Sequence, residues 1–109
     1  VLENSEFFED PGDHAGEMET SLMMHLAPEL VLPLSEAGDG RSRSFKLSGL
    51  RDGLAWAPRN WVQVSRDTGV GDPKAASGEK GRVFLEELAT RIGGFLVDLA
   101  GVDLDDLYE

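Results

Sequence analysis

The chain has 109 residues, an apolar fraction of 40%, a net charge of −11 and no cysteine, so it fits one small domain without disulfides or thiolate metal sites. The negative charge argues against nucleic acid and anionic membranes as partners. No apolar run approaches the roughly eighteen residues that span a bilayer, and no secretory signal opens the chain, so the expected compartment is the cytoplasm.

The charge is spread unevenly along the chain. Residues 1–40 contain ten Asp and Glu and no Lys or Arg, residues 41–82 contain nine Lys and Arg against four acids, and residues 83–109 contain one Arg and seven acids. The basic middle is explained by solvated loops, or it pairs with an acidic segment of the same chain or of a neighbour.

The first part of the chain predicts an extended segment, a turn and a helix. Residues 1–8 are expected to be extended, and EDPG at 9–12 has the composition of a turn. From 15 to 27 apolar residues recur with helical spacing at Met18, Leu22 and Leu26. Pro28 then begins a short turn.

The middle of the chain, 33–76, is predicted to be irregular. RSFKL at 43–47 and WVQVS at 61–65 are expected to be short strands, because the second alternates between apolar and polar residues. GDG at 38–40 is a turn, and DTGVGDP at 67–73 is a loop.

The clearest element is a helix over 77–99. Its apolar stripe consists of Phe84, Leu88, Ile92, Phe95 and Leu99. Ser77 is the predicted N-cap and Gly101 the predicted stop, before the acidic tail. Two amphipathic helices and a few short strands indicate an incomplete α/β layer, taken as one segment over 1–109. The chain begins at Val1 in the middle of a pattern, so we expect it to be part of something longer.

The candidate functional residues lie around the start of the first helix. They are Asp13, His14, Glu17, Glu19 and Ser21. A carboxylate beside the imidazole of His14 would orient it and favour its protonated form, which suits a proton donor. The alternative is that His14 caps the helix and the acids form a solvated face.

Other catalytic arrangements have little support. A catalytic zinc site needs at least three converging ligands, and His25 is expected to pack among apolar neighbours, so no metal ligand is assigned to this chain. GVGDPK at 69–74 lacks the spacing of a phosphate-binding loop, and no serine hydrolase motif is present.

Three segments resemble the creatininase (creatinine amidohydrolase) family. HAGEMETSLM at 14–23 is similar to the family's His-(Ala/Gly)-Gly-x-x-Glu-Thr-Ser segment, and APELV at 27–31 to the Pro-(Asp/Glu)-Leu-Val that follows it. ASGEKG at 76–81 is similar to the family's Ala-Ser-x-Glu-Lys-Gly at the start of the last helix. The three segments occur in the family's order over most of the chain.

The resemblance implies a fold, a reaction and partners. It implies the C-terminal part of a three-layer α/β/α sandwich in an enzyme that uses two divalent metals, commonly zinc or manganese, to hydrolyse a C–N bond of a small cyclic or linear amide. His14 would face the substrate and relay a proton to the leaving nitrogen, Glu19 would support it, and Asp13 would contribute to substrate binding.

The family's metal-binding patterns, a Glu-x-His, a following Asp and an Asn-Gly-His, are absent from this sequence. The resemblance therefore implies that the metals are held by an N-terminal half of the same protein, that none is bound by this chain alone, and that the isolated chain is inactive. It also implies a homo-oligomer, typically a hexamer. The alternative function is a non-catalytic α/β fragment that serves as an oligomerisation or binding module, in which the basic 41–74 region contacts an acidic neighbouring subunit.

Overall fold

The computed structural model describes residues 6–109, and most of the predicted extended segment at 1–8 lies outside them. The elements of the described part are α1 (Glu17–Leu26), η2 (Pro28–Leu30), η3 (Leu34–Glu36), α2 (Ser48–Arg51), α3 (Trp61–Val64), η4 (Pro73–Ala75) and α4 (Gly78–Gly101). The η elements are single 3-10 turns. Only α1 and α4 are long, and they are the two helices that the sequence predicted.

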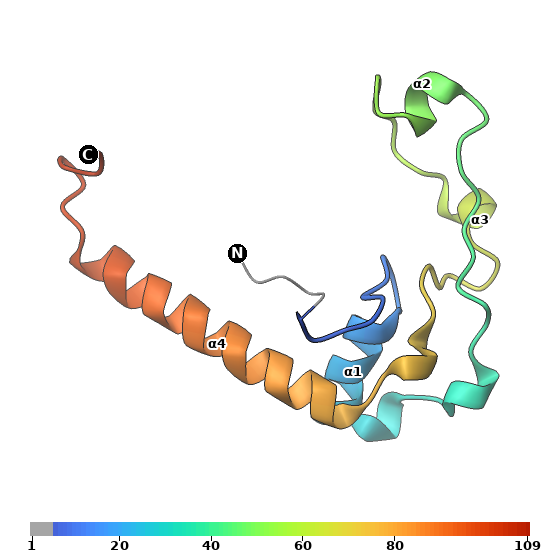
Figure 1. The fold of residues 1–109 in the computed structure, drawn as a ribbon, viewed down its shortest axis with the longest axis horizontal. Coiled ribbons are helices and arrows are strands. Elements are labelled where there is room, and N and C mark those ends of the chain that lie inside the picture. The colour runs from blue at the N-terminus through green and yellow to red at the C-terminus, as the bar shows by residue number, and fades with distance from the viewer. Residues whose placement is uncertain (1–5) are drawn as a thin grey trace.

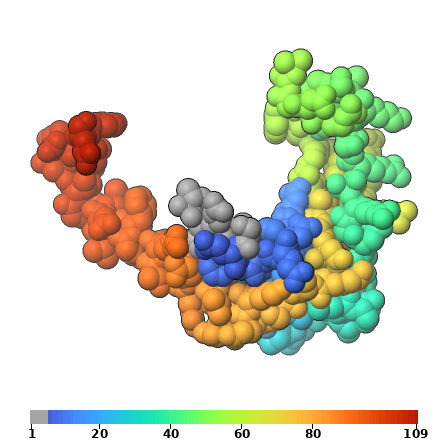
Figure 2. Space-filling model, in the orientation of Figure 1, coloured from blue at the N-terminus to red at the C-terminus, as the bar shows by residue number. Residues whose placement is uncertain are grey.

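The molecule has the shape of an open U (Figure 1). One arm is the second half of α4, the other is a lobe that contains α2 and α3, and α1 lies at the base against the start of α4. The space-filling view shows the same open concavity between the arms (Figure 2). The radius of gyration is 18.1 Å, compared with about 13 Å for a compact chain of this length. The chain is therefore extended and does not form a compact globule.

The predicted α/β architecture is wrong for this chain. In residues 6–109 no sheet forms, and the one strand-type pairing is an isolated antiparallel bridge between His14 and Val70. The part of an α/β/α sandwich that the resemblance implied is therefore not what these residues build.

The two predicted short strands are also wrong. Residues 43–47 form no strand, and WVQV folds as the helical turn α3. Gln63 and Val64 donate their backbone N–H groups to the Asn60 carbonyl, at 2.9 and 3.0 Å. A single strand without a neighbour leaves its backbone groups unpaired, whereas one helical turn satisfies some of them locally. With no second strand available, the local hydrogen bonds determine the structure.

Helix α4 begins where the sequence predicted. The Ser77 hydroxyl accepts a hydrogen bond from the Lys80 N–H at 3.2 Å, which satisfies one of the free donors at the helix start. The helix then packs across α1, and Gly81 is buried at the crossing. A Cβ added to Gly81 would overlap the backbone carbonyl oxygen of Ser21, so only glycine allows the two helices to approach this closely.

We expect Gly81→Ala to destabilise the protein by about 1–3 kcal/mol, because the added methyl group must push α1 and α4 apart. Gly93→Ala on the same helix is the matched control, since a Cβ there meets nothing within 4 Å. It should stabilise by up to about 1 kcal/mol through helix propensity. Urea unfolding of both variants measures the difference, and equal effects would show that the crossing tolerates a side chain.

The small core lies at the base of the U. The ring of Phe84 on α4 meets Phe7 and Phe8 edge-to-face, with centroids 5.2 and 5.1 Å apart. Beyond this cluster Leu88 is half-buried, and from Ile92 onward the predicted apolar stripe is exposed, with Phe95 61% exposed. The stripe is therefore buried at its beginning and open along the free arm.

His25 was expected to pack among apolar neighbours. It is exposed near the end of α1, so that prediction is wrong. Among the described residues, no helix combines the length and the apolar character needed to cross a membrane.

Candidate functional site

The loop that carries His14 is tied to a segment 56 residues later in the chain. The backbone N–H groups of Asp13 and His14 both donate to the Val70 carbonyl, at 2.8 and 2.9 Å, and the Val70 N–H donates to the His14 carbonyl at 2.8 Å. Val70 itself is buried. The backbone position of His14 is therefore set by the 67–73 loop as well as by α1.

Three glycines bring these segments into contact. Gly12 and Gly71 have φ angles of +77° and +130°, which side chains rarely allow. A Cβ added to Gly71 would lie 2.6 Å from the Gly12 Cα, and one added to Gly16 would lie 2.7 Å from the same atom. We call Gly12, Gly16 and Gly71 the glycine contact.

The residue after His14 has an unusual backbone conformation. Ala15 has a φ of +50°, which costs a non-glycine residue about 1–3 kcal/mol. Its N–H donates to Glu19 Oε2 at 2.5 Å, and its carbonyl accepts from the Thr20 hydroxyl at 3.3 Å. Side chains of the first turn of α1 therefore hold the strained residue in place.

The His14 side chain does not cap α1. The N-cap position is Gly16, and no side chain of the described residues caps this end of the helix. His14 is 50% exposed, and its Nδ1 lies 3.7 Å from Glu19 Oε2. The side chains of the predicted histidine and carboxylate thus lie close to each other, at a distance slightly longer than a hydrogen bond.

Asp13 and His14 also meet residues that the sequence did not single out. Arg59 Nη1 donates to Asp13 Oδ2 at 2.5 Å, and the Arg59 guanidinium lies over the Trp61 ring, 4.8 Å from its centroid. The Trp61 and His14 rings meet edge-to-face at 5.5 Å. The Trp61 Nε1–H donates to the Thr68 carbonyl at 3.2 Å.

The ion pair between Asp13 and Arg59 changes the pKa of both residues. The hydrogen bond from Arg59 and its charge hold the pKa of Asp13 below its ordinary value, although slight burial acts in the opposite direction. The same hydrogen bond raises the pKa of Arg59. Asp13 is therefore ionised at neutral pH and is paired with Arg59. A substrate that contacted Asp13 would also contact Arg59.

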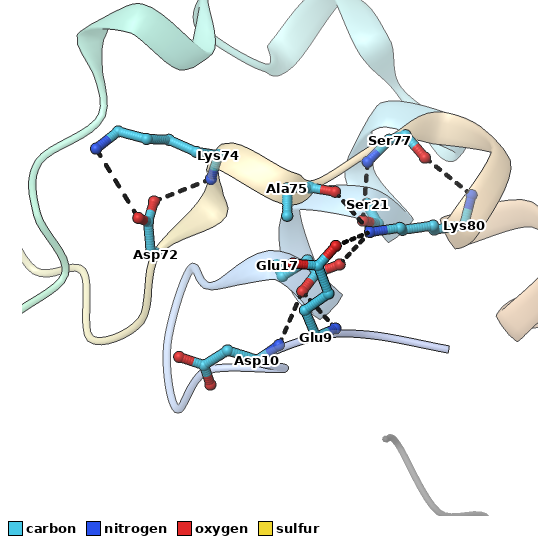
Figure 3. Close-up of polar contacts among 9 residues, drawn as sticks. All are labelled: Glu9, Asp10, Glu17, Ser21, Asp72, Lys74, Ala75, Ser77 and Lys80. Atoms are coloured by element: carbon cyan, nitrogen blue, oxygen red, sulfur yellow. Dashed lines mark hydrogen bonds and ion pairs between the residues drawn. The ribbon is translucent and has the colours of Figure 1, made fainter. Parts of the chain in front are cut away.

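Two of the candidate residues have structural roles (Figure 3). The Glu17 side chain is 1% exposed, accepts from the backbone N–H groups of Glu9 and Asp10 at 2.9 and 3.0 Å, and pairs with Lys80 Nζ at 2.5 Å. The Ser21 hydroxyl is fully buried and accepts from the Ser77 N–H at 3.1 Å. Both side chains face the start of α4, where Glu17 pairs with Lys80 and Ser21 with Ser77.

The proton affinity of Glu17 reflects these contacts. Burial raises the pKa of Glu17, but the Lys80 hydrogen bond, the two backbone N–H donors and the Lys80 charge together lower it below its ordinary value of 4.5. Lys80 also donates to the Ala75 carbonyl at 2.9 Å. In ASGEKG at 76–81, the lysine and the final glycine thus join α4 to α1.

No metal site forms from the described residues. In residues 6–109 no group of three or more His, Asp or Glu side chains converges as metal ligands. The carboxylates nearest His14 are engaged, Asp13 by Arg59 and Glu19 by the Ala15 N–H. The donor set therefore does not fit a divalent metal.

The 67–73 loop supports the site through its backbone. The Asp72 carboxylate accepts from the Lys74 N–H at 3.0 Å, and the Lys74 ammonium lies 3.8 Å from the same carboxylate. The predicted loop is confirmed, and Lys74, which follows it in η4, is engaged by Asp72.

Comparison with known proteins agrees with the resemblance. The creatininase family, described as creatinine amidohydrolase, matches residues 2–96. The crystal structure of a Bacteroides fragilis protein with the provisional name creatinine amidohydrolase is 43% identical, with a TM-score of 0.85. The alignment covers 99% of this chain and 42% of that one, so the chain spans less than half the length of this relative. No curated protein matches the chain. The match over 2–96 shows that the chain belongs to the creatinine amidohydrolase family.

Proposed function

We propose that the protein containing this chain hydrolyses a C–N bond of a small cyclic or linear amide, and that His14 transfers the proton to the leaving nitrogen. The single observation that carries the proposal is the state of His14. Its backbone is fixed by the bridge to Val70, its ring is half exposed, and a carboxylate of Glu19 lies 3.7 Å from Nδ1.

In this proposal each ring nitrogen of His14 has a role. Nδ1 faces Glu19, and Nε2 exchanges a proton with the substrate. As water adds to the amide carbon, a C–O bond forms and the C–N bond breaks. One water proton passes through His14 Nε2 to the departing nitrogen, so charge does not build up on the amine.

Metal and partners belong to the whole protein in this proposal. Residues 6–109 bring no three metal-ligating side chains together, and in this proposal zinc or manganese is bound by an N-terminal half of the protein. An N-terminal half of the protein and further copies of it are the proposed partners. The surface available to them includes the open stripe of α4 at Ile92, Phe95 and Leu99.

Replacing Glu19 tests the proposed pairing. We expect Glu19→Gln in the full-length protein to lower kcat for amide hydrolysis by less than the about 10²–10⁴-fold that an acid–base group contributes, because Glu19 acts through His14. Glu29→Gln, an exposed glutamate on η2, is the control. A kcat equal to that of Glu29→Gln would separate Glu19 from proton transfer.

A further inference from the structure

The surface of the lobe that contains α2 and α3 has an open hollow of about 810 Å³, and most of the residues that line it are exposed. Ligand sites in proteins are commonly of roughly 300–1,000 Å³. The residues that line it are Ser42, Arg43, Ser44, Phe45, Lys46, Leu50, Arg51, Pro58, Arg59, Asn60, Gln63 and Val64. We call it the basic hollow.

The charge of the basic hollow is opposite to that of the chain. Four of its lining residues are Arg43, Lys46, Arg51 and Arg59, and none is acidic, although the chain has 21 acids and ten Lys and Arg. Arg51 lies 3.5 Å from Asp52, which does not line the hollow. In residues 6–109 no ion pair engages Arg43 or Lys46, so the cations there outnumber their partners.

The rest of the lining suits an organic anion better than a bare salt ion. Serine, asparagine and glutamine side chains add uncharged hydrogen-bond donors, and Phe45, Leu50, Pro58 and Val64 add apolar surface. The walls are joined to each other. The Arg43 N–H donates to the Val64 carbonyl at 2.9 Å, and Arg51 Nη1 donates to the Phe45 carbonyl at 3.4 Å.

The basic hollow adjoins the His14 site through one residue. Arg59 lines the hollow, pairs with Asp13 and covers the Trp61 ring, and Trp61 contacts the His14 ring. Arg59 and Trp61 therefore connect the hollow to the His14 ring, and a molecule that reached both places would pass these two residues.

We propose that the basic hollow is an anion subsite, which holds a carboxylate or phosphate group of the amide substrate while the scissile bond lies at His14. The substrate half of this statement rests on the proposed hydrolase function. The hollow is concave and is lined by both cationic and apolar groups. This shape favours a small anion, because an acidic protein surface would need a broad convex or flat patch to bind.

Anion binding is tested first, without catalysis. Inorganic phosphate is titrated into the isotope-labelled full-length protein, and amide chemical shifts are followed by NMR. We expect saturable shifts at 42–46 and 59–64, and roughly tenfold weaker binding in the double variant Arg43→Gln/Lys46→Gln, which loses charge-assisted hydrogen bonds. Arg41→Gln is the matched control, because Arg41 is two residues away, pairs with Asp39 at 3.8 Å and does not line the hollow.

The outcomes separate the two claims. Equal phosphate affinity in the double variant and the control, or shifts spread over all basic residues, would overturn the subsite. For the substrate claim, two amides that differ only by a carboxylate are compared. We expect the preference in kcat/KM for the anionic amide to fall at least about tenfold in the double variant and to remain in Arg41→Gln. Specific phosphate binding with an unchanged preference would overturn the substrate claim alone, and absence of any amide hydrolysis would overturn the proposed function while leaving the subsite standing.

Discussion

Replacement of His14 by alanine is expected to lower kcat of the full-length protein for amide hydrolysis by about 10²–10⁴-fold, the contribution of a positioned acid–base group. Metal content, measured by elemental analysis of the purified protein, should stay unchanged, because no metal site includes His14 among the described residues. The fold should also persist, because the bridge to Val70 uses only backbone atoms of His14.

The second histidine of the chain is the matched control for this experiment. His25 is exposed near the end of α1, and His25→Ala should leave kcat within about twofold. A His14→Ala protein with the same kcat as His25→Ala would show that His14 transfers no proton. A loss of metal with the loss of kcat would place His14 among the metal ligands instead.

The largest effect on stability is expected at Lys80. We expect Lys80→Met to reduce the free energy of unfolding by about 3 kcal/mol, because it leaves the buried Glu17 carboxylate without its countercharge. This is the lower end of the usual range, since the Lys80 side chain is 31% exposed and water can partly replace it. Urea unfolding near neutral pH measures the change.

The pH dependence gives this prediction its sign. The folded pKa of Glu17 lies below the ordinary 4.5, so the stability that the pair contributes is present above pH 4.5 and is lost as the pH falls through the lowered pKa. The penalty of Lys80→Met should therefore shrink in acid, where Glu17 becomes neutral. Arg82→Met is the control, because Arg82 pairs with exposed Glu79 and Glu86 and such pairs contribute little. Equal penalties in the two variants would show that burial of Glu17 has no energetic consequence.

The sequence predicted those parts of the structure that depend on local patterns. The helical spacing of apolar residues and the Ser77 cap are local, and α1 and α4 lie where these signals placed them. The strand prediction for WVQVS was wrong because alternation over five residues predicts a strand only where another strand can pair with it. The α/β prediction failed for the same reason, since a sheet depends on segments that pair at long range.

The site was predictable in part. His14 and Glu19 were both named as candidates from the sequence, and the structure places their side chains 3.7 Å apart. Arg59 and Trp61 were missed because they come from a lobe more than 40 residues away, and a basic residue near a tryptophan is too common a pattern to indicate a site. Glu17 was named as a candidate because the sequence does not show its partner, and Lys80, which gives Glu17 a structural role, is 63 residues later.

The glycine contact has a consequence for how this protein can diverge from its relatives. A side chain at Gly12, Gly16 or Gly71 would clash with the backbone of another of these glycines. Substitution of any one therefore requires the backbone of the others to move. The lobe that contains α2 and α3 has no comparable steric clash, because a Cβ added to Gly49 or Gly53 meets no atom closer than 3.7 Å, although Gly53 has a φ of +81°. Substitutions that change substrate preference would therefore be tolerated more easily in the lobe, and the backbone position of His14 would stay the same.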